Sequence, residues 1–494
     1  MSKSIMVQGT MSGAGKSLLT AALCRIFKED GYKVAPFKSQ NMALNSYITA
    51  DGLEMGRAQV VQAYAAGLEP DVRMNPILLK PSSDVGSQLI VGGKVRGDYS
   101  AKNYFKMKKS LIPEIMEAYN SLASENDIMV IEGAGSPAEI NLKEDDIVNM
   151  GFAKLSNSPV ILVGDIDRGG VFAQLYGTIA LLEEDERKRI IGTVINKFRG
   201  DVDILKPGLS MLEEKTGIPV LGVVPYTKAK IDDEDSLAPS LEETKVHKVI
   251  DIAVIRLPRI SNFTDLTPLE QHPALGVRYV SHMEELGNPD FIILPGTKNT
   301  MGDLEWLREN GLEMRIRQLY AKGTPVLGIC GGYQMLGEKL SDPENVEHGG
   351  EMTGIGILPI ETVFAGQKVR TRVSGQVAGS PFEHAQIEGY EIHMGKSIST
   401  REVQPFCIFP DGHTDGVSLE NAWGTYLHGL FDTGELVTTL ADFLLTKKGL
   451  STGNYEAVSH KAYQEEQLDI LAKEVRSGLD MEAIYRAMDK FNLH

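Results

Sequence analysis

The most constraining feature of the sequence is an alternation of short apolar runs, rich in β-branched residues, with stretches of helical length. In the first half, each run has the length of a buried strand, and each intervening stretch can hold a crossover helix. This alternation predicts a mostly parallel sheet covered by helices on both faces. The predicted strands are Ile5–Gln8, Val34–Phe37, Ile128–Glu132, Val160–Gly164, Ile191–Asn196 and Val220–Val224.

The pattern breaks once and then restarts, which predicts a second domain. The stretch KAKIDDEDSLAPSLEETKVHK is polar, charged and poor in periodic apolar residues. A chain of 494 residues is also too long for one compact core. We predict an α/β fold of two domains (1–228 and 250–445), a linker (229–249) and a C-terminal helical extension (446–494). The second set of predicted strands is Ile252–Leu257, Arg278–Val280, Phe291–Leu294 and Val326–Ile329, with Val417–Leu419 and Gly424–Leu427 as further candidates.

Composition excludes several classes of function. The net charge of −17 disfavours non-specific attraction to nucleic acid or to an anionic membrane. No apolar run approaches the roughly 18–20 residues that cross a bilayer, and the N-terminal residues lack the features of a secretory signal. The three cysteines (Cys24, Cys330 and Cys407) are far apart and form no disulfide framework. We therefore expect a protein of the reduced cytoplasmic compartment.

A glycine-rich loop, GTMSGAGKS, follows the first predicted strand and precedes a helical run. Such a loop points backbone N–H groups at phosphate oxygens, helped by the helix N-terminus. Lys16 would neutralise the β- and γ-phosphates, and Ser17 would bind Mg²⁺. The spacing departs from the usual motif because five residues, rather than four, separate Gly9 from Gly15. The alternative is a glycine-rich turn without a ligand, but the strand–loop–helix context favours a nucleotide site.

Three charged residues could complete this site. Glu132 ends a predicted strand and Asp51 lies in TADGLEMGRAQ, so either carboxylate could hold Mg²⁺, directly or through water. The alternative for each is a helix cap or a solvated turn. Lys38 follows the second predicted strand, and ligands gather at the carboxyl ends of parallel strands. We therefore place Lys38 in the same cleft.

The segment PVLGICGGYQMLG has the layout of a nucleophile elbow around Cys330. A buried strand ends at the reactive residue, glycines permit a tight turn, and a helix follows. The helix N-terminus would lower the pKa of the thiol, and the thiolate is the attacking form. Neighbouring backbone N–H groups could stabilise an oxyanion. A lone cysteine is usually a small core residue, but the flanking Gly328, Gly331 and Gly332 argue against that reading.

A cysteine nucleophile needs a base, and the sequence offers two histidines. His428 lies in WGTYLHGLFD, where an apolar strand leads into a turn, and His393 lies in EGYEIHMG. Long separation along the chain is normal for a cysteine–histidine pair. We favour His428 because of its placement and keep His393 as the alternative.

Several motifs together resemble a known enzyme family across nearly the whole chain. GICGGYQ resembles the nucleophile motif of class I glutamine amidotransferases, and LPGTKNT resembles their oxyanion-side loop. GTMSGAGKS resembles the phosphate loop of the dethiobiotin synthetase superfamily, which has the same extra residue. EGAGSPAEINL, GDIDRGGVFA, INKFRGD and LLKPSSDVGSQLIV resemble the cobyric acid synthases. The resemblance implies a dethiobiotin-synthetase-like domain followed by a class I amidotransferase domain.

The resemblance also implies roles for individual residues. Cys330 matches the nucleophile and His428 the catalytic histidine. The remaining matches are Gly13, Gly15, Lys16 and Ser17 for phosphate and Mg²⁺, Glu132 for the metal, Asn196 for adenine, and Gly296 and Gly331 for the oxyanion. One departure concerns the glutamate usually found two residues after the histidine, which is Leu430 here. The histidine therefore works in a dyad, or a group from elsewhere in the chain orients it.

The family's reaction uses ATP, Mg²⁺ and glutamine to amidate four side-chain carboxylates of adenosylcobyrinic acid a,c-diamide. Asp146 could handle this substrate or lie in a solvated acidic turn. Arg168 could pair with a substrate carboxylate or be structural. A cobyrinic acid a,c-diamide synthase, which shares both modules, is the nearest alternative. A nucleotide-switched partitioning or scaffold ATPase is an alternative from another class, but it leaves Cys330 unexplained.

Overall fold

The computed structural model describes residues 2–81, 86–232, 248–453 and 458–492. The chain forms two compact units. Unit 1 contains the residues up to Met42, Glu54–Ile231 and the residues from Gln464 onward. Unit 2 contains Ala43–Leu53 and Asp232–Tyr463. Most of the predicted linker, residues 229–249, lies outside the described residues. The two-domain α/β architecture with largely parallel sheets is confirmed.

Within the described residues, unit 1 is built on a six-stranded sheet in which all neighbouring strands are parallel. All six predicted strands are present and form this sheet. In spatial order they are β12 (Val220–Pro225), β11 (Ile190–Phe198), β10 (Val160–Asp165), β1 (Lys3–Gly9), β9 (Ile128–Glu132) and β2 (Val34–Phe37). Side chains alternate between the two faces of such a strand, so each face buries its own set of residues.

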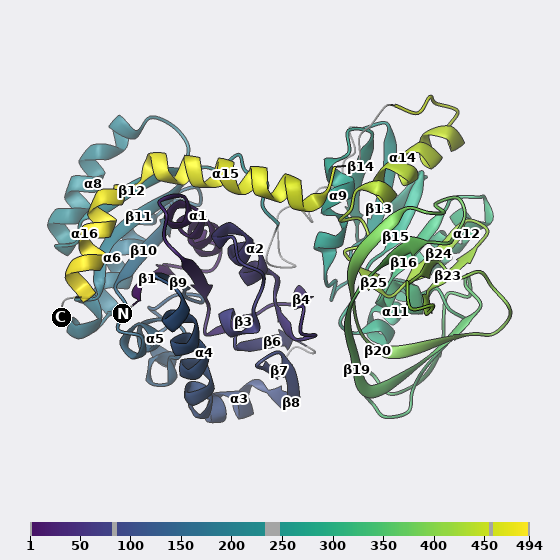
Figure 1. The fold of residues 1–494 in the computed structure, drawn as a ribbon, viewed down its shortest axis with the longest axis horizontal. Coiled ribbons are helices and arrows are strands. Elements are labelled where there is room, and N and C mark those ends of the chain that lie inside the picture. The colour runs from purple at the N-terminus through teal and green to yellow at the C-terminus, as the bar shows by residue number, and fades with distance from the viewer. Residues whose placement is uncertain (1, 82–85, 233–247, 454–457, 493–494) are drawn as a thin grey trace. The chain divides into compact units, whose positions relative to one another are not determined.

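Helices cover both faces of this sheet (Figure 1). On one face, Ile5 and Val7 share a hydrophobic core with helices from both ends of the chain. On the other face, Phe37 packs against Tyr119 and Phe152, with ring centroids 5.2 Å away in each case. The helices of the first face are α1 (Lys16–Glu29), α2 (Arg57–Ala66), α15 (His460–Gly478) and α16 (Met481–Asn492), and those of the second are α4 (Ile112–Glu125) and α5 (Met150–Leu155).

The predicted C-terminal helical extension is divided between the units. Its residues up to Tyr463 belong to unit 2, whose core also holds the preceding helix α14 (Glu435–Lys447), whereas α15 belongs to unit 1 from Gln464 onward. There Arg25 binds Asp469 with Nε–Oδ1 2.8 Å, and Leu468 joins the core. The described residues from Gln464 to Asn492 are therefore part of the N-terminal fold.

Unit 1 also has a small sheet that the strand pattern did not predict. It pairs four strands in the order β3 (Gln40–Met42), β6 (Ile77–Pro81), β7 (Gly86–Val91) and β8 (Lys94–Ser100). Strands β6, β7 and β8 are antiparallel neighbours, whereas β3 pairs with β6 in parallel.

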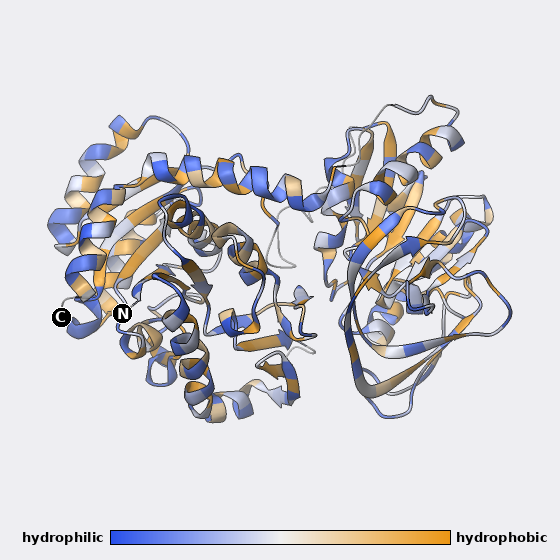
Figure 2. Cartoon of the chain, in the orientation of Figure 1, coloured by the Kyte–Doolittle hydropathy of each residue, from blue (hydrophilic) through white to orange (hydrophobic). Residues whose placement is uncertain are grey.

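Unit 2 has a central six-stranded sheet of its own among the residues described. Its order is β14 (Leu275–Val280), β13 (Ile250–Ile255), β15 (Phe291–Leu294), β16 (Val326–Ile329), β24 (Ala422–Thr425) and β23 (Val417–Leu419). Only the edge strand β23 pairs antiparallel in this sheet. Strands β13 to β16 are those that the sequence predicted, and the two further candidates became β23 and β24. In Figure 2 these central strands are among the most hydrophobic segments of the ribbon.

A second, largely antiparallel sheet of unit 2 is built on two long neighbouring strands, β19 (Ile360–Val377) and β20 (Gln386–Ser399). Strand β20 also pairs with the short strand β25 (Leu427–His428), which places Tyr390 opposite His428. Neither long strand was predicted. Across the described helices of both units, none combines the length and apolarity that a membrane span needs.

Candidate functional site

Cys330 lies at a sharp turn between the parallel strand β16 and the short helix α13 (Gly331–Met335). Its backbone has φ +51° and ψ −108°, a conformation that side-chain-bearing residues rarely adopt. Gly328 permits the turn, because a Cβ on this glycine would lie 2.7 Å from the Gly332 carbonyl oxygen. The strand–turn–helix arrangement of a nucleophile elbow is therefore present.

A buried histidine–carboxylate pair lies beside this cysteine. The Nδ1 atom of His428 is 2.6 Å from Oδ2 of Asp265, and Oδ1 of Asp265 accepts a hydrogen bond of 3.0 Å from the Gly429 N–H. The exposed fractions of His428 and Asp265 are only 1% and 6%. The Cys330 side chain is close enough to His428 to raise the pKa of this histidine. The three side chains therefore form a connected chain, Cys330–His428–Asp265.

The electrostatics of the pair favour a charged imidazole. Burial alone would lower the pKa of His428, but the Asp265 carboxylate and the Cys330 side chain outweigh it and raise this pKa from its usual 6.5 to about 10. An imidazolium next to Cys330 stabilises a thiolate, which is the nucleophilic form of cysteine. Leu430, at the position of the usual glutamate, is fully buried in the core. The carboxylate that orients His428 is instead that of Asp265.

The alternative base, His393, has other partners. Its Nδ1 atom is 2.7 Å from the Gly395 carbonyl oxygen, and its ring stacks on Tyr426 at 3.7 Å between centroids. His393 lies in strand β20, and the atom of this strand that contacts Cys330 is the Ile392 carbonyl oxygen, 3.7 Å from Sγ. The arrangement therefore favours His428 as the base.

The two glycines predicted to bind the oxyanion border the same site. A Cβ on Gly296 would lie 3.1 Å from Cε1 of His428, and a Cβ on Gly331 would lie 3.1 Å from the Thr297 nitrogen. Either substitution would therefore crowd the neighbourhood of Cys330. Donation of the Gly296 and Gly331 N–H groups to an oxyanion stays a prediction.

The other two cysteines differ from Cys330 in their surroundings. Cys24 and Cys407 are fully buried, and burial raises the pKa of each thiol well above its usual range. A thiol in that state is a poor nucleophile. Neither Cys24 nor Cys407 is therefore suited to act as a nucleophile.

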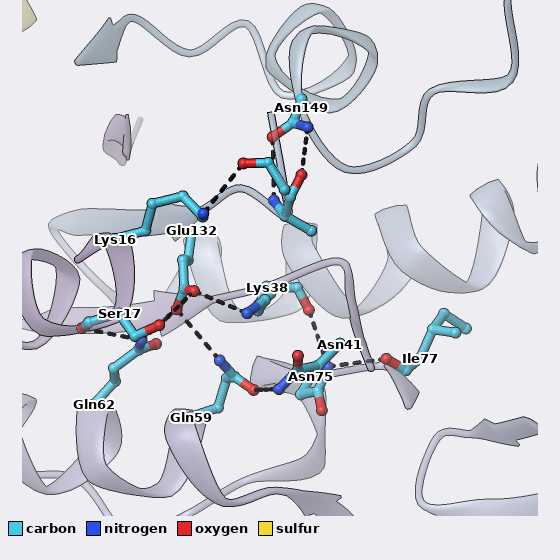
Figure 3. A network of polar contacts seen from close by, with 12 residues as sticks. Lys16, Ser17, Lys38, Asn41, Gln59, Gln62, Asn75, Ile77, Glu132 and Asn149 are labelled. Carbon is cyan, nitrogen blue, oxygen red and sulfur yellow. Dashed lines mark hydrogen bonds and ion pairs between the residues drawn. The ribbon is translucent and has the colours of Figure 1, made fainter. Parts of the chain in front are cut away.

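A second cluster lies in unit 1 at the carboxyl ends of its strands, around Glu132 (Figure 3). Oε1 of Glu132 accepts hydrogen bonds of 2.8 Å from the Ser17 hydroxyl and from Nζ of Lys38. Oε2 accepts a bond of 2.5 Å from Gln62, and Gln59 approaches the same oxygen at 3.5 Å. The exposed fraction of Glu132 is 1%, so its charge is stabilised by these donors rather than by solvent.

The glycine-rich loop leads into this cluster. Gly13 and Gly15 have φ of +74° and +92°, which glycine adopts without strain. Nζ of Lys16 donates to the carbonyl oxygens of Met11 and Gly135 at 3.0 and 3.1 Å, so the lysine lies across the loop. These backbone conformations are those that a phosphate-binding loop requires.

Two polar residues of β11 contact the same loop. Nδ2 of Asn196 donates to the Ala14 carbonyl oxygen at 2.9 Å. Nζ of Lys197 donates to the Gly13 carbonyl oxygen at 2.7 Å and to the buried Asp165 carboxylate at 2.8 Å. Lys197 and Asp165 were missed in the sequence, although both lie in quoted motifs at strand ends. The structure therefore adds a second lysine to the loop.

The donor set of this cluster fits a hard cation such as Mg²⁺, which prefers oxygen ligands. Ser17 and Glu132 supply a hydroxyl and a carboxylate 2.8 Å apart. In the part of the chain that the structure describes, no group of three His, Cys, Asp or Glu side chains gathers as a self-sufficient metal site. Such a site suits Mg²⁺ held jointly by protein and substrate phosphates. Asp51 is exposed in a turn of the segment Ala43–Leu53, which belongs to unit 2, and its role as a metal ligand stays a prediction.

The two predicted substrate residues have different surroundings. The carboxylate of Asp146 accepts hydrogen bonds of 2.8–2.9 Å from the N–H groups of Val148, Asn149 and Gly151. These contacts favour a structural role for Asp146 at the start of α5. Arg168 follows β10 with a side chain that is 63% exposed and 3.9 Å from Asp165. Its guanidinium remains accessible to an anion.

Comparisons with known proteins agree with both halves of this arrangement. Residues 5–238 match the family model described as the CobQ/CobB/MinD/ParA nucleotide binding domain. Residues 251–436 match the CobB/CobQ-like glutamine amidotransferase domain. The two matched regions contain the Glu132 cluster and the Cys330–His428–Asp265 chain, respectively.

Full-length relatives are more similar still. The cobyric acid synthase of Ruminiclostridium cellulolyticum is 58% identical over 99% of this chain and 98% of its own length. That of Lachnoclostridium phytofermentans is 58% identical over 99% of this chain and 100% of its own length. That of Clostridium acetobutylicum is 55% identical over 98% of this chain and 98% of its own length. The chain therefore belongs to the cobyric acid synthase family, the glutamine-dependent amide-forming ligases of cobalamin biosynthesis.

Proposed function

We propose that the chain uses ATP and glutamine to amidate the four remaining side-chain carboxylates of adenosylcobyrinic acid a,c-diamide, giving cobyric acid. The observation that carries this proposal is the presence, in one chain, of a buried Cys330–His428–Asp265 chain and of a phosphate loop joined to Glu132. A glutamine-hydrolysing site and a carboxylate-activating site are the two parts that the reaction requires.

Unit 2 is proposed to release ammonia from glutamine. The Cys330 thiolate attacks the side-chain amide carbon, and the resulting oxyanion accepts hydrogen bonds from backbone N–H groups near Gly296 and Gly331. The His428 imidazolium then protonates the departing nitrogen, so that ammonia leaves and a thioester remains. Water, deprotonated by the neutral imidazole, cleaves the thioester to glutamate. Asp265 holds Nδ1 throughout and fixes the tautomer that this exchange needs.

Unit 1 is proposed to activate the corrinoid carboxylate. A carboxylate oxygen attacks the γ-phosphorus of ATP, ADP leaves, and an acyl phosphate forms. Lys16 and Lys38, which contact the phosphate loop and Glu132, are proposed to balance the phosphate charge, and Asn196 is proposed to contact adenine. Mg²⁺, held by Ser17 and Glu132, would neutralise charge on the phosphate oxygens. Ammonia then attacks the acyl carbon, phosphate leaves, and the nitrogen loses a proton to give the amide.

Arg168 is proposed to pair with a carboxylate of the corrinoid. Its exposed guanidinium lies in the loop after β10, at the same edge of the sheet as the phosphate loop.

The three cysteines in the described residues are unbridged, which supports a reducing cytoplasmic location.

Two corrinoid substrates distinguish this proposal from its nearest alternative. The purified chain is incubated with ATP, Mg²⁺ and glutamine, together with either adenosylcobyrinic acid a,c-diamide or cobyrinic acid. Mass spectrometry should show four successive amidations of the diamide, each with release of glutamate. Amidation of cobyrinic acid at its a and c positions, with the diamide left unchanged, would identify a cobyrinic acid a,c-diamide synthase instead.

A further inference from the structure

A short segment of the nucleotide-binding half of the sequence is built into the amidotransferase unit. Ala43–Leu53 lies inside the region that matches the nucleotide binding domain, residues 5–238. It nevertheless belongs to unit 2, together with Cys330 and His428. It contains strand β4 (Ser46–Ile48), and Asn45, Ser46 and Tyr47 are all buried. A buried segment of this kind contributes to the structure of unit 2.

The segment contacts the loop that carries Asp265. The backbone N–H of Asn262 donates to Oδ1 of Asn45 at 2.7 Å, and the Ser46 N–H donates to Oδ1 of Asn262 at 3.1 Å. Asn262 has φ +52°, a left-handed conformation that asparagine adopts more readily than most other non-glycine residues. Each asparagine side chain therefore accepts a hydrogen bond from the backbone of the other's segment, and Asn45 thereby helps to hold Asn262 in place.

Asn262 begins the turn that presents Asp265 to His428. Its carbonyl oxygen accepts the Asp265 N–H at 3.0 Å, closing the first turn of the short helix η5 (Phe263–Leu266). A displacement of Asn262 would therefore displace the carboxylate of Asp265. Because the Asp265–His428 distance is 2.6 Å, even a small displacement would lengthen this bond.

Tyr390 provides a second connection from the segment to the same histidine. Its hydroxyl donates to the Ser46 carbonyl oxygen at 3.0 Å and accepts from Nδ2 of Asn262 at 3.3 Å. Its ring stacks on the imidazole of His428, with centroids 5.5 Å apart and an angle of 24° between the planes. The segment therefore contacts two residues that lead to the imidazole: Asn262, which begins the turn carrying Asp265, and Tyr390, whose ring stacks on His428.

We propose that Ala43–Leu53 completes the glutamine site and that Asn45 is a positioning residue for it, acting through Asn262 on Asp265 and His428. This proposal rests on the proposed function, because it assumes that His428 and Cys330 hydrolyse glutamine. Residues 250–445 alone therefore lack a part of the amidotransferase site. The missing part comes from the sequence between β3 and β5 (Glu54–Gly56).

The test uses the full chain and three variants. Asn45→Ala removes the acceptor for the Asn262 N–H, whereas Asn45→Asp keeps an oxygen there. Tyr390→Phe keeps the ring on His428 and removes both hydroxyl hydrogen bonds. We expect Asn45→Ala and Tyr390→Phe each to lower the kcat of glutamine hydrolysis on the order of tenfold, the scale of losing one or two buried hydrogen bonds. Amidation with added ammonia should stay within about twofold of wild type, and Asn45→Asp should restore most of the glutamine-dependent rate.

A pH profile and a control separate positioning from a general loss of structure. The alkaline limb of glutamine hydrolysis should move to lower pH in Asn45→Ala, because a displaced Asp265 stabilises the imidazolium less. Ala50→Ser, an exposed change in the same segment, should match wild type in every assay. Hydrolysis by Asn45→Ala at the rate of Ala50→Ser would overturn the proposal. An equal fall of the glutamine- and ammonia-dependent rates, at an unchanged melting temperature, would also overturn it.

Two further outcomes are assigned in advance. If Asn45→Ala melts well below wild type, Tyr390→Phe decides: a selective loss of glutamine use supports the proposal, and an unchanged rate overturns it. Failure of the proposed function is recognised in the wild-type chain itself, which would then release no glutamate or amidate no corrinoid. Failure of the positioning role leaves those wild-type activities intact.

Discussion

His428 and Asp265 form a buried pair with 2.6 Å between Nδ1 and Oδ2, although 163 residues separate them along the chain. Such a pair fixes which ring nitrogen faces Cys330, and it stabilises the imidazolium that forms when the thiol loses its proton. The amidotransferase site is thus a three-residue chain whose carboxylate comes from the turn after β13, not from the position two residues beyond the histidine.

Replacing Asp265 by Asn should impair glutamine use selectively. The amide cannot stabilise the imidazolium, so we expect the glutamine-dependent rate to fall about 10²-fold, within the range for general acid–base catalysis. The ammonia-dependent rate should remain near wild type. The measurement is amide formation with glutamine or with ammonium chloride as the nitrogen source.

Asp411→Asn is the matched control, because it makes the same chemical change at a carboxylate with 71% side-chain exposure in the same unit. It should leave both rates unchanged. A glutamine-dependent rate of Asp265→Asn equal to that of this control would show that the carboxylate is not required.

The same pair predicts a dependence of stability on pH. Since the pKa of His428 is raised from 6.5 to about 10, the charged pair stabilises the fold fully below about pH 6.5. This contribution is lost as the pH rises through about 10. We expect the difference in Tm between wild type and Asp265→Asn to be largest near pH 6 and to shrink toward pH 10. A difference that stays constant across this range would contradict the raised pKa.

Glu132→Gln should abolish amidation with either nitrogen source. The change removes the carboxylate that Ser17 and Lys38 contact, and with it the proposed metal ligand. Glutamine hydrolysis in unit 2 should persist. The lysine also loses its buried anionic partner, which costs about 3–5 kcal/mol in comparable pairs, so Tm should fall.

Glu184→Gln is the control for this variant, because Glu184 is an exposed carboxylate of unit 1 whose partner is the exposed Lys188. It should change neither activity nor Tm measurably. Retention of ATP-dependent amidation by Glu132→Gln would remove Glu132 from the activating site.

Much of the fold follows from local patterns in the sequence. The parallel strands of both units were predicted because buried strands form continuous apolar runs, and their order placed Lys38 and Glu132 at one edge. The elbow around Cys330 was predicted because its glycines must lie where the backbone turns. By contrast, β19 and β20 were not predicted, because half-exposed strands that mix apolar and polar residues lack such continuous apolar runs.

The components that were missed depend on contacts between distant segments. Asp265 lies in NFTDL, which carries no motif, and only the fold brings its carboxylate to His428. The membership of Ala43–Leu53 in unit 2 is equally invisible in the sequence, because hydrogen bonds such as that from Asn262 to Asn45 define it. Local sequence patterns predict helices, strands and turns, whereas contacts between distant residues become visible only in the three-dimensional structure.

The most direct test of the two-site account is amide formation by Cys330→Ser, measured on one preparation with glutamine and with ammonium chloride. A serine hydroxyl has a far higher pKa than a thiol, so it cannot replace the nucleophile at neutral pH. The account predicts loss of the glutamine-dependent reaction and a near wild-type rate with ammonia. Undiminished glutamine use, or loss of both reactions in a variant that melts like wild type, would contradict it.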